Sequence, residues 1–388
     1  MDSSRNELLF KKVCLYLLPI IAPLLFIVIL EDILSTAKVK LFVEKNENQQ
    51  ILNIQQCRYG TQNVEEICHF VPRSYRDGQK LVLVLGDSTA AGYPDYRSNN
   101  FSSLLELSLN KTNQNFHRVE NYASSCKDSD FVRRCFEKSL KARPDMVVIY
   151  TGHNDFTNRF HPHAISSLVQ KVPWIFDLVT YLRFHSRTYS LVAEFFNDKS
   201  RPNGSYGINS EIEYQARHKE VTGHLIENFQ IVSGIAEENK IKLVMIVPVS
   251  NLTEFEPPPR ELNNVFFDTK RNQAMKLISD GRDNLKKGKT DLALFDFIKA
   301  RDNDPVPSRL TTEAYKQLKT NFSDRDNLLL VDFEKELETT FPDKHKFGCD
   351  LFGGHETAQC DQFHLNARGH QLLSDFLLKN IQQKWPDF

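Results

Sequence analysis

A serine near the start of the chain and an aspartate and a histidine near its end could together do nucleophilic chemistry. Ser88 stands in a Gly-Asp-Ser segment, whereas Asp361 and His364 are three residues apart. A serine hydroxyl is a poor nucleophile until a base takes its proton, and a histidine oriented by a carboxylate is the usual base. One turn of chain can carry both Asp361 and His364. We therefore expect Ser88 to be a nucleophile that His364 and Asp361 activate.

Ser88 directly follows a segment with the pattern of a buried strand. Residues 81–85 are five consecutive aliphatic residues, the run expected of a parallel strand that is buried on both faces. Gly86 and the small residues after Ser88 allow a tight turn at the carboxyl end of that strand, where open α/β sheets bind their ligands. The alternative is a plain strand followed by a serine-capped helix.

The Gly-Asp-Ser segment and the late Asp-x-x-His segment resemble two sequence blocks of the SGNH or GDSL hydrolase family. A third block agrees, because residues 147–150 form another buried-strand pattern that runs into Gly-His-Asn-Asp at residues 152–155. The resemblance implies an α/β protein with a three-layer α/β/α, flavodoxin-like SGNH hydrolase fold around a central five-stranded parallel sheet. It implies Ser88 as nucleophile with Asp361 and His364 as acid and base, and it requires neither a metal nor an organic cofactor.

The resemblance also assigns an oxyanion hole to three groups. They are the Ser88 N–H, the Asn154 side chain and the N–H of Cys126, which stands where the family has a glycine. Any residue except proline can supply a backbone N–H, so this departure does not abolish the hole. The alternative for residues 123–129 is a turn tied by its cysteine. His153 is expected to line the pocket rather than to act as the base, because no carboxylate is spaced to orient it.

Further apolar runs complete the predicted sheet and bound the hydrolase domain. Strands are expected at residues 119–122, 241–248 and 328–332, and we expect the whole domain to span residues 81–388. A chain of 388 residues exceeds a typical domain of roughly 100 to 200 residues, which favours a domain with an insertion. With 49 basic and 50 acidic side chains, the chain lacks the basic excess of a nucleic-acid-binding protein.

The N-terminal segment has the pattern of a membrane anchor. Residues 13–30 form an 18-residue apolar run without a charge, long enough to span most of a ~30 Å hydrocarbon core. Basic residues precede the run and acidic residues follow it, so we expect residues 1–12 in the cytoplasm and the catalytic domain outside, in the periplasm or the extracellular space. Residues 31–80 would form a stalk and a disulfide loop. A cleaved signal peptide is the alternative.

Six of the seven cysteines fall into pairs that are close in the sequence, and Cys14 lies in the apolar run. The pairs are Cys57 and Cys68, Cys126 and Cys135, and Cys349 and Cys360. Local pairing of this kind is typical of short disulfide-closed loops in an oxidising compartment. Buried free cysteines are the alternative, since no spacing indicates a metal site.

An insertion over residues 274–307 resembles a single tetratricopeptide repeat. The residues at the spacing of the repeat are Gly281, Gly288, Ala293, Phe297, Ala300 and Pro305. One repeat cannot bury its own apolar face. We therefore expect this helix pair to pack on the hydrolase domain, with a protein partner as the alternative. Arg309, just after the insertion, is expected at the surface rather than in the pocket.

The combined expectation is an esterase. The chain is expected to cleave a carboxylic ester, the O-acyl group of a glycan or a lipid, through a covalent acyl-enzyme on Ser88. One alternative is an O-acyltransferase that moves the acyl group to a cell-surface glycan, because its first half-reaction is the same. The other is a non-catalytic, membrane-tethered scaffold that binds a partner through the helical repeat.

Overall fold

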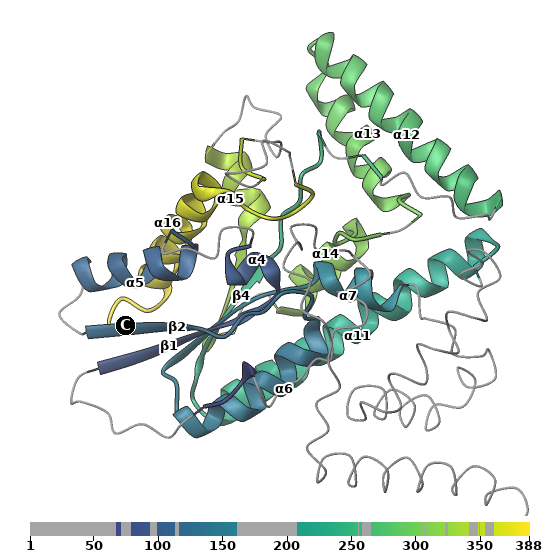
Figure 1. The fold of residues 1–388 in the computed structure, drawn as a ribbon. Coiled ribbons are helices and arrows are strands. Elements are labelled where there is room, and N and C mark those ends of the chain that lie inside the picture. The colour runs from purple at the N-terminus through teal and green to yellow at the C-terminus, as the bar shows by residue number, and fades with distance from the viewer. Residues whose placement is uncertain are drawn as a thin grey trace, which may run out of the picture. The chain divides into compact units, whose positions relative to one another are not determined.

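Five parallel strands form the sheet at the centre of the computed structural model, in the order β2-β1-β3-β4-β5 (Figure 1). The strands are β1 (Gln79–Gly86), β2 (Phe116–Asn121), β3 (Met146–Tyr150), β4 (Lys242–Val247) and β5 (Leu328–Asp332). β1, β3 and β4 are aliphatic and almost completely buried, as expected of parallel strands covered on both faces. The predicted α/β fold with a five-stranded parallel sheet is confirmed.

The residues that the structure describes all belong to one compact unit, within the bounds 54–163 and 203–388. The described residues are 67–70, 79–93, 99–112, 116–160, 208–254, 256–257, 265–305, 307–322, 325–340, 348, 350–353 and 361–388. The predicted membrane segment at 13–30, the preceding residues 1–12 and most of the predicted stalk at 31–80 lie outside them. Within the described ranges, no helix is long and apolar enough to cross a membrane.

Helices cover both faces of the sheet, so the fold has three layers (Figure 1). These helices are α5 (Phe101–Thr112), α6 (Ser129–Ser139), α11 (Glu211–Glu238), α14 (Thr312–Phe322), α15 (Phe333–Thr340) and α16 (Ala367–Lys384). Val82 and Val84 of β1 enter a core that they share with α5, α15 and α16. Leu81 and Leu83 enter the opposite core with α6, α11 and α14. This alternation is the period-two pattern of a strand.

Two short helices lie where β1 and β3 end. They are α4 (Ser88–Ala91) after β1 and α7 (His153–Arg159) after β3. β2 lies on one side of β1 and β3 on the other, so the strand order reverses between β1 and β3. Open α/β sheets bind ligands at this reversal, outside the carboxyl ends of the strands. The topology therefore brings Ser88 and Asn154 to the same edge of the sheet.

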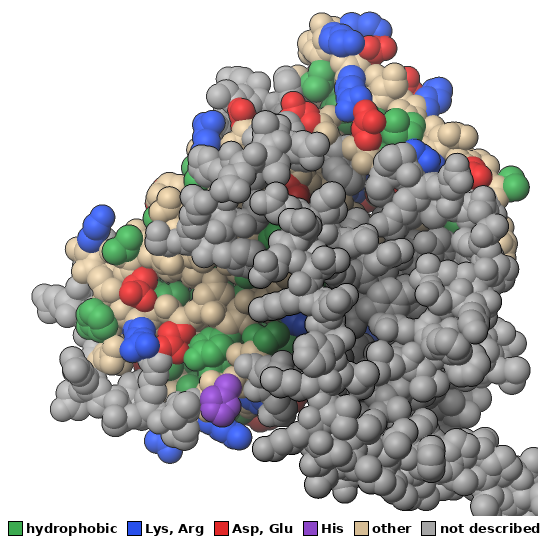
Figure 2. All heavy atoms as spheres, in the orientation of Figure 1, with side chains coloured by type: hydrophobic (Ala, Val, Ile, Leu, Met, Phe, Trp, Pro, Cys, Tyr) green, Lys and Arg blue, Asp and Glu red, His purple; other side chains and the backbone are tan. Residues whose placement is uncertain are grey.

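A helical hairpin overlaps the predicted insertion at residues 274–307 but begins nine residues earlier and ends five residues earlier; it lies at the upper right of Figure 1. Its helices are α12 (Val265–Lys286) and α13 (Thr290–Asp302). A Cβ on Gly281 would lie 2.9 Å from the Phe297 ring, so glycine lets the two helices approach. The hairpin packs on the hydrolase domain, where Lys270 pairs with Glu211 of α11 at 2.7 Å. Its visible outer face mixes acidic, basic and apolar side chains (Figure 2).

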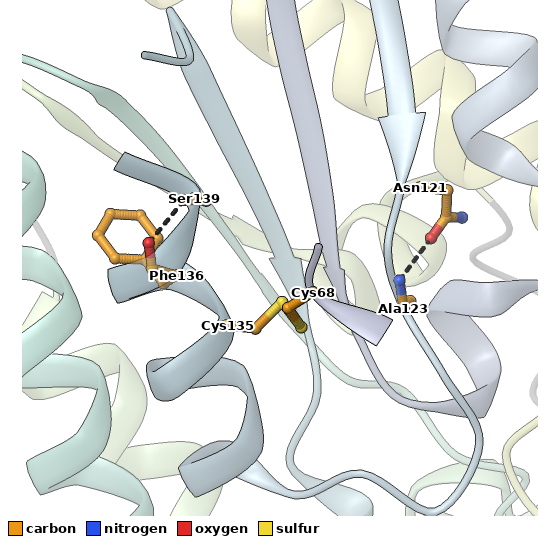
Figure 3. The surroundings of a disulfide bond; sticks show 6 residues. All are labelled: Cys68, Asn121, Ala123, Cys135, Phe136 and Ser139. Atoms are coloured by element: carbon orange, nitrogen blue, oxygen red, sulfur yellow. Dashed lines mark hydrogen bonds between the residues drawn. A yellow bond between two sulfur atoms is a disulfide. The ribbon is translucent and has the colours of Figure 1, made fainter. Parts of the chain in front are cut away.

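A disulfide joins Cys68 to Cys135 of α6 (Figure 3). The two residues are 67 positions apart, so the predicted local pairs of Cys57 with Cys68 and of Cys126 with Cys135 are wrong. Cys126 is itself disulfide-bonded. The folded chain brings Cys68 beside α6, and spacing along the sequence carries no information on that contact. The third predicted pair lies outside the described residues.

Candidate active site

The turn between β1 and α4 presents Ser88 at the edge of the sheet. A Cβ on Gly86 would lie 2.2 Å from the carbonyl oxygen of Tyr150 in β3, so the turn passes too close to β3 for any other residue. The Asp87 carboxylate accepts a hydrogen bond from the Thr89 N–H at 3.0 Å and caps α4. Ser88 is the first residue of that helix. The glycine and the aspartate before it thus shape the turn that carries the serine.

Ser88, His364 and Asp361 form a continuous chain of short polar contacts. Ser88 Oγ lies 2.7 Å from His364 Nε2, and His364 Nδ1 lies 2.9 Å from Asp361 Oδ2. The other carboxylate oxygen, Asp361 Oδ1, accepts hydrogen bonds from the N–H groups of Phe363 and His364, both at 2.9 Å. These two bonds curl the loop so that the carboxylate reaches an imidazole three residues later. The structure therefore brings together three residues that the sequence separates by up to 276 positions.

The surroundings of Asp361 keep its carboxylate ionised. Burial raises the pKa of Asp361, but the His364 ring and the hydrogen bonds from two backbone N–H groups outweigh it and lower the pKa to about 2. An ionised carboxylate 2.9 Å from His364 Nδ1 favours the tautomer with its proton on Nδ1, which leaves Nε2 to accept the proton of Ser88. This is the arrangement of a general base and its orienting group.

Two aromatic rings flank the His364 imidazole. The ring centroid of Tyr93 lies 4.6 Å from that of His364, and the centroid of Phe363 lies 4.5 Å from it. The Tyr93 N–H donates to the Ser88 carbonyl oxygen at 2.9 Å, so one of these rings is tied to the helix of the serine. Rotation of the imidazole away from Ser88 would have to displace them.

The loop at residues 123–129 has a glycine-like conformation at Cys126. The φ angle of Cys126 is 64°, in the left-handed region that favours glycine. A glycine is what the sequence resemblance leads one to expect at this position. Cys126 therefore has a backbone conformation that glycine adopts readily, and its sulfur is held in a disulfide.

Side chains of α7 hold the 123–129 loop in place. Asn154 Nδ2 donates to the carbonyl oxygen of Lys127 at 3.1 Å, and Asn158 Nδ2 donates to that of Cys126 at 3.1 Å. A side-chain amide nitrogen carries two hydrogens, so Asn154 keeps one for a further acceptor. Asn154 thus anchors the loop while retaining a donor.

The sequence analysis missed the contribution of Asp155, which follows Asn154. The Asp155 carboxylate accepts hydrogen bonds from the N–H of Ser129 at 3.0 Å and from its hydroxyl at 2.5 Å. Burial, and then the Asp128 carboxylate, raise the pKa of Asp155 to about 7. The available signal was a second polar residue at the end of a buried strand.

No group of three His, Cys, Asp or Glu side chains in the described part of the chain could hold a metal ion.

His153, expected to line the pocket, is an interior residue with 1% of its surface exposed. Its Nδ1 accepts a hydrogen bond from the Leu310 N–H at 3.0 Å, and its Nε2 donates to the Val249 carbonyl oxygen at 3.1 Å. Its ring stacks on Phe363 at 4.8 Å. Burial lowers the pKa of His153 to about 3. A neutral ring with both nitrogens engaged cannot be the base; it instead supports the aromatic ring beside His364.

The chain matches a protein-family model over most of its length. The model, described as GDSL-like Lipase/Acylhydrolase, matches residues 82–377. That range includes Ser88, Asn154, Asp361 and His364. A comparison with curated proteins finds no match.

Similar solved structures come from bacterial esterases and lipases. A lipase/acylhydrolase from Enterococcus faecalis is 16% identical, with 79% of this chain and 96% of that chain covered and a TM-score of 0.36. A GDSL-like lipase from Bacteroides thetaiotaomicron is 12% identical, with 83% and 98% covered and a TM-score of 0.35. An acetyl xylan esterase is 14% identical, with 77% and 98% covered and a TM-score of 0.36. On the family match over residues 82–377, the chain belongs to the GDSL-like lipase/acylhydrolase family and is an ester-hydrolysing enzyme.

Proposed function

We propose that the enzyme cleaves a carboxylic ester through a covalent acyl group on Ser88, with His364 as the base and Asp361 as its orienting residue. The observation that carries this proposal is the pair of contacts from Ser88 Oγ to His364 Nε2 at 2.7 Å and from His364 Nδ1 to Asp361 Oδ2 at 2.9 Å. Because the hydroxyl and the base are already within hydrogen-bonding distance, proton transfer needs no rearrangement of the protein.

The reaction has two halves. Ser88 Oγ attacks the ester carbonyl while His364 Nε2 takes the hydroxyl proton, and the collapsing tetrahedral intermediate expels the alcohol, which receives that proton from His364. Water then attacks the acyl group with His364 again as the base, and the acid leaves as Ser88 regains its proton. Asp361 stays ionised and stabilises the imidazolium in both halves.

The oxyanion of each tetrahedral intermediate is held by the Ser88 N–H, the Cys126 N–H and Asn154 Nδ2 in this proposal. The first N–H groups of a helix have no partner within the helix, which makes the Ser88 N–H a suitable donor. The glycine-like φ of Cys126 and the bond from Asn154 to the Lys127 carbonyl oxygen support the other two donors. Each donor of such a hole is typically worth ~3 kcal/mol of the barrier.

Labelling with a fluorophosphonate probe tests the nucleophile. The purified protein should form one adduct on Ser88, and Ser88→Ala and His364→Ala should both abolish it, because the probe reacts only with an activated serine. A folded, disulfide-intact protein that forms no adduct would contradict the proposed chemistry and would favour the scaffold alternative.

The acyl acceptor and the substrate can be distinguished by product analysis. The family description names acylhydrolases, which supports water as the acceptor. We propose an O-acyl group of a glycan or a lipid as the substrate, and an O-acetylated glycan and a lipid ester should be compared directly. Release of free acid supports the hydrolase; an acylated glycan acceptor in place of free acid would establish the acyltransferase alternative.

The enzyme acts outside the cytoplasm in this proposal, held by a membrane-spanning segment at residues 13–30. The disulfide between Cys68 and Cys135 supports an oxidising compartment, and the sequence pattern of residues 13–30 supports the anchor. The full chain should fractionate with membranes and be degraded by protease added to the outer side. A soluble chain with reduced cysteines in the cytoplasm would contradict both points.

The α12–α13 hairpin is a single tetratricopeptide-like repeat that stabilises the hydrolase domain in this proposal. The fit of Gly281 against Phe297 supports the likeness. The hydroxyl of Tyr214, on α11, donates to the carbonyl oxygen of Asp304 just after the hairpin at 2.7 Å, which supports packing on the domain. Deletion of residues 265–302 should lower the melting temperature. An unchanged melting temperature would favour a protein partner as the surface that covers the hairpin.

A further inference from the structure

A buried asparagine grips the loop that carries Asp361 and His364. Asn251 lies just after β4 and is 0% exposed. Its N–H donates to the Gln362 carbonyl oxygen at 2.8 Å, and its Nδ2 donates to the Asp361 carbonyl oxygen at 3.0 Å. Its Oδ1 accepts from the Glu254 N–H at 3.0 Å. One side chain and one backbone N–H therefore hold two consecutive carbonyl groups of the loop.

The two carbonyl groups that Asn251 binds lie two and three residues before the base. Phe363 alone lies between Gln362 and His364, and the Asp361 carboxylate accepts a hydrogen bond from the His364 N–H and lies 2.9 Å from His364 Nδ1. Movement of the Asp361 backbone would therefore move the imidazole relative to Ser88. We infer that Asn251 is a positioning residue for the Asp361–His364 pair, a role that rests on the proposed function of that pair.

The buried ion pair of Arg309 and Asp304 supports the backbone of Asn251. Arg309 Nη1 donates to the Asn251 carbonyl oxygen at 2.8 Å, and Arg309 Nη2 lies 3.8 Å from Asp304 Oδ2. Arg309 is 3% exposed and Asp304 1%, so the expectation of a surface arginine is wrong. The neighbouring Ser308 Oγ contacts Gln362 Oε1 at 2.5 Å. The segment 304–309 thus supports the loop of Asp361 and His364 in two ways. Ser308 contacts the loop directly, and Arg309 supports it through Asn251.

The bonds require an amide at position 251. An aliphatic side chain would remove the hydrogen bonds to the Asp361 carbonyl oxygen and from the Glu254 N–H, both of which are partly buried, and this loss is unfavourable. An aspartate would fill the same space and still accept from Glu254, but its carboxylate cannot donate to Asp361. Asn251→Asp therefore separates the donor function of the amide from its volume.

Fluorophosphonate labelling of Ser88 tests the role, with the rate constant at saturating probe (kinact) and the probe concentration for half that rate (KI) measured separately. We expect Asn251→Ala and Asn251→Asp to lower kinact by about tenfold to a hundredfold, as misplacement of catalytic groups typically does. KI should stay within about twofold, because the substitution displaces the base rather than the probe site.

Asn110→Ala is the matched control. Asn110 accepts from the His117 N–H at 2.7 Å and donates to its carbonyl oxygen at 2.9 Å, so it also grips the backbone with both ends of its amide. His117 pairs with Lys80 near the start of β1, at the opposite end of that strand from Ser88. Asn110→Ala should lower the melting temperature and leave kinact unchanged.

The outcomes separate this role from the proposed function. If the wild-type protein does not label, both the proposed function and the positioning role are wrong. If the wild type labels and the folded Asn251 variants react with the wild-type kinact, only the positioning role is wrong. If both Asn251 variants melt below the assay temperature, Ser308→Ala decides, because it weakens the same loop from a half-buried position. We expect Ser308→Ala to lower kinact by about two- to fivefold, and an unchanged kinact would overturn the inference.

Discussion

The 361–366 loop and the 123–129 loop flank the same serine but are held by different chemistry. Asn251 and backbone N–H groups hold the first, and the pKa of its catalytic acid, Asp361, is lowered to about 2. The second is held by Asp155, whose pKa is raised to about 7, and by a disulfide at Cys126. Changes of pH near neutrality and of redox state should therefore act on the 123–129 loop first.

The largest effect is expected in the 361–366 loop, from Asp361→Asn. An amide can present its N–H to His364 Nδ1 and so favour the tautomer that cannot accept the serine proton. We expect kcat for ester hydrolysis to fall by about 10⁴-fold with little change in folding. A loss of less than about tenfold in kcat would show that His364 does not need the Asp361 carboxylate to act as the base.

Asn154→Ala is the corresponding change at the 123–129 loop. It removes the proposed oxyanion donor and the bond to the Lys127 carbonyl oxygen. We expect kcat to fall by about a hundredfold or more while the protein stays folded. Wild-type turnover in this variant would remove Asn154 from the oxyanion hole and leave it only the role of a loop anchor.

Removal of the Cys68–Cys135 disulfide should weaken the α6 side of the molecule. The bond joins two residues that are 67 positions apart in the sequence. One of them lies on α6, which starts where the 123–129 loop ends. We expect the Cys68→Ala/Cys135→Ala variant to lose about 2 to 4 kcal/mol of unfolding free energy, measured in urea. Equal stability of the oxidised wild type and the variant would argue against a stabilising role for this disulfide.

Asp155→Asn should change how stability depends on pH. The folded-state pKa of Asp155 is raised from its ordinary 3.8 to about 7, so its protonated form stabilises the fold below pH 3.8 and that contribution is lost as the pH rises through 7. Relative to wild type, the variant should therefore gain about 4 kcal/mol of unfolding free energy between pH 4 and pH 8. Asp361→Asn should show the opposite slope at low pH, because the pKa of Asp361 is lowered. Parallel pH profiles of stability for wild type and both variants would show that the two loops do not differ in their response to pH.

The residues that the sequence could identify are those whose signal is local. Ser88 and Asn154 follow aliphatic runs that had to be central strands, and Asp361 and His364 lie within one turn. Asn251 and Arg309 carried no such signal, because their contacts join positions 110 and 58 residues apart. Arginines are mostly exposed, so burial of Arg309 beside Asp304 could not be anticipated from its type.

Disulfide connectivity failed for the same reason. The prediction paired cysteines that are close in the sequence, whereas a disulfide requires cysteines that are close in the folded structure. Cys135 is buried on α6 and Cys68 reaches it from a segment outside the sheet. The replacement of the family glycine by Cys126 was visible in the sequence, whereas its left-handed backbone required the structure.

The burial of Asn251 also determines how the protein should be produced. Asn251, Leu252 and Thr253 form an acceptor sequence for N-glycosylation. A eukaryotic secretory pathway adds the glycan to a nascent chain, and the folded side chain, 0% exposed, leaves no room for one. Chains glycosylated there could not seat the amide against Asp361 and would be recovered misfolded or inactive. Export to a bacterial periplasm supplies the disulfides without this modification.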